Sequence, residues 1–333
     1  MPHNPFLQVQ ANTRLHLPAT PTFGEAGHLW RQEEIDALIL AIAARRPLLV
    51  RGEAGSGKSQ LARAAAIVLS GAANNQDHLF DEVLHARFEA LDLLYRFDVV
   101  ERLADAELHR LDSSNKKYLK PGKLWQAMKV NQTDAAAATS TGAAVLLIDE
   151  IDKADADIPN ALLGVLGNRS FGVPMTTPPQ TIKCERMPLV IISTNEEREM
   201  PPAFVRRCIV LNQNPPEADD AFLGWLVARG DAHTHLHIDA AAAQAATQQV
   251  LADRKAAIKN GFAKVGLAEY LDLLTALHDL SAHEPENVRA HRQIYWLERL
   301  SAYALVKGAD QDQARASLAD IASPAVASGQ TTV

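Results

Sequence analysis

GEAGSGKS, residues 52–59, is the stretch that decides the fold of this chain. It fits G-x-x-x-x-G-K-[ST], the pattern of a phosphate-binding loop. An apolar run at 47–51 precedes it and predicts a short strand, and residues 60–66 follow with helix-forming side chains. Glycines let the backbone curl so that its N–H groups face a polyphosphate, and the N-terminus of the next helix adds partial positive charge. The sequence therefore predicts a phosphate site between a strand and a helix.

The pattern of this loop also predicts what it binds, a polyphosphate and Mg²⁺. Lys58 can reach the β- and γ-phosphates, and the Ser59 hydroxyl can bind Mg²⁺. The alternative is a glycine-rich turn that only caps a helix. It is disfavoured because the four fixed positions coincide by chance in roughly 1% of chains of this length. The predicted nucleotide-binding residues are Gly52, Glu53, Ala54, Gly55, Ser56, Gly57, Lys58, Ser59 and Gln60.

The composition narrows the class of protein. The chain has 333 residues and a net charge of −7, so its surface is not basic overall, although a local basic loop is compatible with that balance. Cys184 and Cys208 lack the spacing of metal ligands or of a disulfide scaffold. The first residues do not resemble a signal peptide, and no apolar run reaches the ~20 residues that a membrane span needs. We expect a cytoplasmic protein with no membrane partner.

Two further apolar runs predict buried parallel strands. The run at 145–148 leads into Asp149 and Glu150, and the run at 188–194 leads into Asn195. Strands that alternate with helices indicate an α/β fold with a parallel sheet, in which ligands bind at the carboxyl ends of the strands. We therefore expect these three side chains beside the phosphate-binding loop.

The chemistry of these side chains suggests their roles. Asp149 can hold Mg²⁺, usually through water. Glu150 can polarise a water for in-line attack on the γ-phosphate. The neutral amide of Asn195 can orient that water or contact the γ-phosphate without adding charge. The alternative for Asp149 and Glu150 is that they are solvated acids that cap the next helix. The alternative for Asn195 is that it only forms an Asx-turn.

Residues 201–208, PPAFVRRC, predict a short helix that carries Arg206 and Arg207. Paired arginines can stabilise the transition state of phosphoryl transfer, in cis or from a neighbouring subunit. A surface helix whose arginines pair with acids is an equally open reading of the residues alone.

The motifs stand in the order that is typical of AAA+ ATPases. GEAGSGKS, VLLIDE, the strand ending in STN and PPAFVRRC follow one another, and the prolines at 215–216 lead into a helical region that resembles the lid of that family. DLLYR at 92–96 and LKPGKL at 119–124 resemble a pattern of the MoxR-like family, as does an expected β-hairpin over 167–182. The resemblance covers about residues 27–300.

The resemblance implies roles by position. It places Lys58 and Ser59 on Walker A, Asp149 and Glu150 on Walker B, and Asn195 on sensor 1. Four arginines complete the set. Arg207 falls on the arginine finger with Arg206 as the reserve, and Arg289 resembles sensor 2 with Arg292 as the second candidate.

The domain organisation follows from shifts in composition. We expect an extended N-terminal arm over 1–25 and a large AAA+ α/β domain over 26–214, which opens with a helix over 27–44. A smaller helical lid is expected over 215–322, followed by a small, polar and disordered tail over 323–333.

The leading hypothesis is a MoxR-like AAA+ ATPase that forms a homo-oligomeric ring, expected as a hexamer, and remodels or activates a protein partner. The family resemblance suggests a von Willebrand factor A-domain protein as that partner. One alternative is a nucleic-acid motor or loader on the same fold, which the acidic balance and 5% aromatic content disfavour. Another is a nucleotide-gated scaffold with little turnover, which the intact Lys58, Glu150 and Arg207 disfavour.

Overall fold

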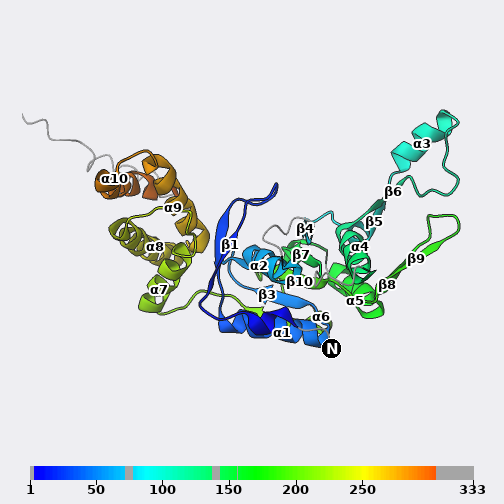
Figure 1. Ribbon diagram of the computed structural model, residues 1–333, viewed down its shortest axis with the longest axis horizontal. Coiled ribbons are helices and arrows are strands. Elements are labelled where there is room, and N and C mark those ends of the chain that lie inside the picture. The colour runs from blue at the N-terminus through cyan, green and yellow to red at the C-terminus, as the bar shows by residue number, and fades with distance from the viewer. Residues whose placement is uncertain (1–3, 72–77, 137–142, 156, 305–333) are drawn as a thin grey trace, which may run out of the picture. The chain divides into compact units, whose positions relative to one another are not determined.

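The computed structural model describes residues 4–71, 78–136, 143–155 and 157–304. The chain divides into two compact units, Met1–Asn214 and Pro215–Val333, which are shown in Figure 1. Residues 305–322 of the expected lid and 323–333 of the expected tail lie outside the described residues.

A five-stranded parallel sheet forms the centre of the first unit. Its strands lie in the order β11-β3-β10-β7-β4, so neighbours in the sheet are not neighbours in the sequence. All six residues of the middle strand are buried, as expected for a parallel sheet covered on both faces. The prediction of an α/β fold with a parallel sheet is confirmed. The strands are β3 (Leu48–Arg51), β4 (Leu79–Val83), β7 (Val145–Asp149), β10 (Leu189–Thr194) and β11 (Ile209–Asn212).

Helices cover both faces of this sheet, and the alternation of side chains along each strand divides the core in two. Leu48 and Val50 pack in the same cluster as the buried residues of α1 (Gln32–Ala44) and α2 (Lys58–Ser70). Leu49 lies between them in sequence and packs in the other cluster, with residues of α4 (Lys123–Ala136) and α5 (Asp157–Asn168). Figure 1 shows the sheet with these helices around it.

The N-terminal segment corrects the prediction of an extended arm over 1–25. Residues Pro5–Gln8 form a 3-10 helix, and β1 (Arg14–Leu17) pairs antiparallel with β2 (Ala26–Leu29). Phe6 and Leu17 are fully buried in the cluster that contains α1 and α2. The segment is therefore part of the first unit, because its few large apolar side chains pack into the core.

Two antiparallel ribbons extend the first unit. One consists of β5 (Tyr95–Phe97) and β6 (Leu119–Pro121), with α3 (Val99–Glu107) between them. The other is the expected hairpin, β8 (Ser170–Val173) and β9 (Gln180–Lys183). Two hydrogen bonds join the ribbons: Asn115 Nδ2 donates to the Met175 carbonyl at 2.8 Å, and the Thr177 N–H donates to the Ser114 carbonyl at 3.1 Å.

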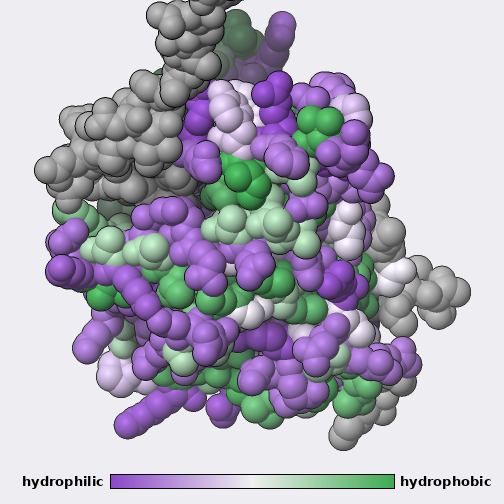
Figure 2. All heavy atoms as spheres, turned by 90° about the vertical axis from the view of Figure 1, so that its left-hand side faces the viewer, coloured by the Kyte–Doolittle hydropathy of each residue, from purple (hydrophilic) through white to green (hydrophobic). Residues whose placement is uncertain are grey.

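The second unit is built from helices throughout its described part. Their inner faces share one core that includes Phe222, Leu226, Tyr270 and Leu274. On the face shown in Figure 2, polar side chains dominate and apolar ones lie in small groups between them. Among the described residues, no helix combines the length and apolar character needed to cross a bilayer. The helices are α7 (Asp219–Gly230), α8 (Ala240–Asn260), α9 (Leu267–Ser281) and α10 (Glu286–Ala304).

Candidate nucleotide-binding site

The predicted phosphate-binding loop connects β3 to the N-terminus of α2. Gly57 caps the helix in the left-handed conformation, with φ 94°, which a residue without a Cβ adopts at little cost. At the other end of the loop, a Cβ on Gly52 would lie 2.9 Å from the Gln213 carbonyl oxygen, so only glycine fits there. Both glycines are therefore required by the path of the backbone.

Lys58 lies at the centre of the site with its side chain turned back over the loop. Its Nζ donates at 2.8 Å to three acceptors, the carbonyl oxygens of Gly52 and Glu53 and Oδ1 of Asn195. Burial lowers the pKa of Lys58, and the nearby carboxylates, led by Asp149, oppose that shift. The ammonium group is thus held where a phosphate anion would satisfy it.

The structure brings the predicted acids to the same place. Ser59 Oγ donates to Oδ2 of Asp149 at 2.7 Å, which joins the start of α2 to the end of β7. Glu150 follows with φ 59°, a left-handed conformation that costs a residue with a side chain about 1–2 kcal/mol. The turn sends the two adjacent carboxylates in different directions, so each can act separately.

Asn195 links the acids to the loop. Its Oδ1 accepts from Lys58, and its Nδ2 lies 3.5 Å from Oε1 of Glu150. The other carboxylate oxygen of Glu150 lies 3.0 Å from Nζ of Lys153. A single chain of polar contacts therefore runs from the ammonium group of the loop to the candidate water-activating carboxylate.

The remaining loop residues are placed as follows. The Glu53 N–H donates to Oδ1 of Asn214 at 3.0 Å, so the last residue of the first unit contacts the loop. Ala54 and Gly55 are exposed, and Gln60 lies half-buried in the first turn of α2. Ser56 Oγ is buried without a hydrogen-bond partner in the described part of the chain.

These observations fit a bound polyphosphate. The loop amides at the N-terminus of α2, Lys58 and the unpaired Ser56 hydroxyl would hold the phosphates. Ser59 and Asp149 form a pair of oxygen donors of the kind that Mg²⁺ prefers. The loop can therefore hold the phosphates of a nucleotide, and the Ser59–Asp149 pair can hold a metal ion.

Arg206 and Arg207 lie at the end of α6 (Pro202–Val205), and both are exposed. Within the described residues, neither guanidinium forms an ion pair or hydrogen bond, so their pairing with surface acids is not observed. The Arg206 carbonyl oxygen accepts from Nη1 of Arg46 at 3.5 Å. Among the residues that the structure describes, neither guanidinium contacts Asp149 or Glu150.

The two sensor 2 candidates lie in α10 of the second unit. Arg289 Nη2 donates to the Glu284 carbonyl oxygen at 3.5 Å, and its Nε is buried without a partner among the residues described. Arg292 Nε pairs with Oε1 of Glu284 at 3.1 Å. Both contacts are internal to the second unit, so the role of Arg289 stays a prediction.

Two residues of the site were not predicted. Asp152 is buried, and its Oδ2 accepts from the N–H groups of Asn195 at 3.2 Å and Glu197 at 3.0 Å, which fixes the turn after β10. Ser193 contacts both Asp149 and Glu150. The only sequence signal for either was its position, within three residues of an expected site residue.

Comparisons with known proteins agree with this geometry. Residues 47–208, just under half of the chain, match the family model of the AAA domain, dynein-related subfamily. No curated protein matches. Of 607 matching chains among solved structures, one is the crystal structure of a presumed ATPase from Cytophaga hutchinsonii ATCC 33406. It is 12% identical, with a TM-score of 0.35 over 86% of this chain and 87% of that chain, values too low to carry weight.

The fold is that of a P-loop NTPase. A central five-stranded parallel sheet flanked by helices, a phosphate-binding loop after β3 and a helical C-terminal unit are the features of the AAA+ fold. The chain has the P-loop AAA+ fold, as its motif order predicts.

Proposed function

We propose that this protein binds ATP with Mg²⁺ at the loop of residues 52–59 and hydrolyses it. The observation that carries the proposal is the convergence of Lys58, Ser59, Asp149, Glu150 and Asn195, which come from three separate segments. A phosphate-binding loop alone would serve binding. A carboxylate beside it, held by an amide that also contacts the lysine, supplies what hydrolysis needs.

The chemistry can be divided among these residues. Bound Mg²⁺ would neutralise charge that develops on the phosphate oxygens. Lys58 and the loop amides would orient the phosphates, and Ser59 with Asp149 would hold the metal. Glu150 accepts a proton from the attacking water, and Asn195 orients that water. Each role matches the chemistry of its side chain.

Assembly into a ring is part of the proposal. Arg206 and Arg207 are exposed and carry no ion pair in the described structure, so a guanidinium is available to a neighbouring subunit. A homo-oligomeric ring of MoxR type, with six subunits in the cytoplasm, would place Arg207 against the nucleotide of the next subunit. The motif order and the β8–β9 hairpin support this choice.

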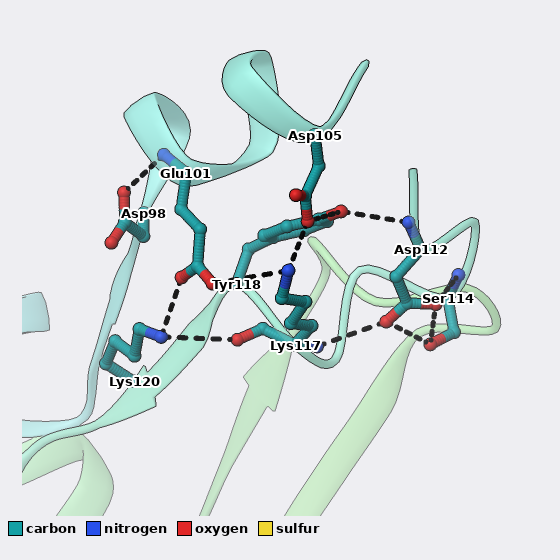
Figure 3. A network of polar contacts seen from close by, with 8 residues as sticks. All are labelled: Asp98, Glu101, Asp105, Asp112, Ser114, Lys117, Tyr118 and Lys120. Atoms are coloured by element: carbon teal, nitrogen blue, oxygen red, sulfur yellow. Dashed lines mark hydrogen bonds and ion pairs between the residues drawn. The ribbon is translucent and has the colours of Figure 1, made fainter. Parts of the chain in front are cut away.

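We further propose that the ATPase acts on a protein partner through the segment around α3. The polar side of this helix faces β6 (Figure 3). Lys117 pairs with Asp105 and lies 3.5 Å from Glu101, and Lys120 Nζ donates to Glu101 at 2.8 Å. The Tyr118 hydroxyl donates to Asp105 at 3.0 Å. These contacts pair the carboxylates of Glu101 and Asp105 within the protein and fix the orientation of the helix.

The opposite side of this segment is apolar and exposed. Val99, Val100 and Leu103 are 63%, 79% and 61% exposed, and Leu108 and Leu111 follow them. Large aliphatic side chains that gather on one exposed segment are typical of a contact with another protein. A von Willebrand factor A-domain protein is the partner class that the family resemblance suggests.

The double substitution Val100→Asp and Leu103→Asp tests the partner surface. It should leave basal phosphate release unchanged, and it should change stability by no more than about 0.5 kcal/mol per site because both side chains are exposed. The measurement is a comparison of the proteins retained by a Glu150→Gln variant with and without the two substitutions. Loss of a retained protein is expected, whereas Leu40→Asp, an exposed change on α1, should retain it. Identical retention with and without the substitutions would exclude this surface.

Lys58→Ala tests the nucleotide site. The substitution removes the ammonium group that donates to two carbonyl oxygens of the loop, while the backbone cradle remains. Charge-assisted hydrogen bonds contribute about 1.5–3 kcal/mol each, so the affinity for ATP should fall by roughly 100-fold. Calorimetric titration with ATP measures this, and circular dichroism controls for folding. A folded variant that binds ATP as tightly as the parent would show that the nucleotide lies elsewhere.

A further inference from the structure

Ser193 lies where the two strands that form the site run side by side. In the pairing of β10 with β7, Ile192 is the partner of Ile148. Ser193 and Asp149 are the next residues on these strands, so the sheet itself places them together. Ser193 is fully buried, and its polar hydroxyl follows the apolar residue Ile192 on β10.

The Ser193 hydroxyl contacts both acids at once. It donates to Oδ1 of Asp149 and accepts from the N–H of Glu150 at 3.0 Å. The hydroxyl therefore donates to Asp149, the candidate metal ligand. The same oxygen accepts from the backbone of Glu150, the candidate water-activating residue. A side chain without an oxygen at this position could do neither.

Two serines donate to the Asp149 carboxylate, one to each oxygen. Oδ2 accepts from Ser59, which is itself a candidate metal ligand, whereas Oδ1 accepts from Ser193, which is enclosed in the sheet. Ser193 can therefore hold the plane of the Asp149 carboxylate even when the Ser59 hydroxyl binds the metal. Partners of this kind orient the carboxylates that bind metals.

The contact with Glu150 holds the strained turn after β7. Glu150 has φ 59° and ψ 48°, a conformation that persists in residues with side chains only where the surroundings fix it. Its N–H points to Ser193 and donates there, which satisfies a backbone donor just beyond the end of β7. The direction in which the Glu150 side chain leaves the backbone therefore depends on Ser193.

We propose that Ser193 is the positioning residue of this site, setting the Asp149 carboxylate for Mg²⁺ and the Glu150 backbone for water activation. The inference rests on the proposed ATP hydrolysis and names a residue that acts through both acids without touching the substrate.

The test is a titration of Mg²⁺ into the full chain with a fluorescent ATP analogue. In Ser193→Ala, the Mg²⁺ concentration that gives half of the metal-dependent gain in analogue affinity should rise by about 10–100-fold, as for other groups that orient metal ligands. Analogue affinity in the presence of EDTA should stay as in the parent, because the phosphate-binding loop is unchanged. The kcat for ATP should also fall, without a matching rise in the EDTA-state dissociation constant.

Ser281→Ala is the matched control. Ser281 is also buried and also uses one hydroxyl to donate, to the Leu277 carbonyl at 2.7 Å, and to accept, from Gln293 at 2.9 Å. It lies in the second unit, so its loss should affect stability alone. If Ser193→Ala does not fold, the test uses Ser193→Thr and Ser193→Val. Threonine and valine have the same shape, and threonine has a hydroxyl where valine has a methyl group.

The outcomes separate the inference from the function on which it rests. Threonine should keep the parental Mg²⁺ dependence and valine should lose it. If the parent shows the metal-dependent gain and Ser193→Ala or Ser193→Val retains it at the same Mg²⁺ concentration, Ser193 is not the positioning residue. If the parent itself shows no gain from Mg²⁺, the assignment of the metal to Ser59 and Asp149 fails, and the inference fails with it.

Discussion

Arg207→Ala is expected to lower the rate of ATP hydrolysis in the assembled protein by about 10³–10⁵-fold, the contribution that an arginine finger makes in related phosphoryl transfers. Nucleotide binding to an isolated subunit should change little, because the guanidinium is exposed and makes no contact with the described residues of its own site. Steady-state phosphate release and ATP titration measure the two quantities. Arg206→Ala is the matched control, since it removes the adjacent exposed arginine.

Mixing two inactive variants makes this test sharper. Subunits with Arg207→Ala keep Glu150, and subunits with Glu150→Gln keep Arg207. In a ring with shared sites, some interfaces of a mixed assembly pair an intact Glu150 with an intact Arg207, so partial activity should return. If both variants assemble and exchange subunits but mixing restores nothing, the finger does not act in trans or all sites must act together. If Arg206→Ala is inactive and Arg207→Ala is active, the finger is Arg206.

Glu150→Gln is the second change with a large expected effect. The amide keeps the size and polarity of the side chain but cannot accept the proton of the attacking water, a contribution on the order of 10²–10⁴-fold. Tight ATP binding should remain because Lys58 and the phosphate-binding loop are intact. Single-turnover hydrolysis and retention of ATP through gel filtration measure the separation of binding from turnover.

The structure offers a control for this variant. Glu197→Gln removes a carboxylate from the turn after β10, where Glu197 contributes its N–H to Asp152 and its side chain to no contact in the described structure. It should hydrolyse ATP at the parental rate. A Glu150→Gln protein that also turns over at the parental rate would exclude Glu150 as the proton acceptor.

The centre of the fold could be predicted because its signals are local. The phosphate-binding loop requires glycines at fixed positions, and the strands β7 and β10 are continuous apolar runs that end in polar residues. In a parallel sheet the carboxyl ends of such strands meet at one edge. Asp149, Glu150 and Asn195 were therefore placed beside Lys58 by topology alone, and the structure brings them into contact.

The N-terminal segment could not be predicted in the same way. Its fully buried core residues, Phe6 and Leu17, lie far apart in a stretch that mixes polar and apolar residues. The four-residue strand β2 also precedes α1, in a stretch where the helical spacing of residues 27–44 conceals it. Short strands that pair only with each other leave no periodic pattern, so their presence depends on tertiary packing.

Ser193 and the α3 segment show a second limit. Ser193 reads in sequence as the small residue near the end of an apolar strand, and its role depends on which residue of β7 lies opposite. In α3 the ion pairs of Glu101 and Asp105 with Lys117 and Lys120 hold the polar side against the chain, and the apolar side is exposed. Contacts between distant residues decide both cases.

Phosphate release from the purified parent, measured with ATP and a series of Mg²⁺ concentrations beside Lys58→Ala, tests the central claim most directly. We expect continuous release that requires Mg²⁺, saturates with ATP and is lost in Lys58→Ala. A parent that binds ATP but releases no phosphate in any assembled form, or a Lys58→Ala protein that releases it at the parental rate, would contradict hydrolysis at this site.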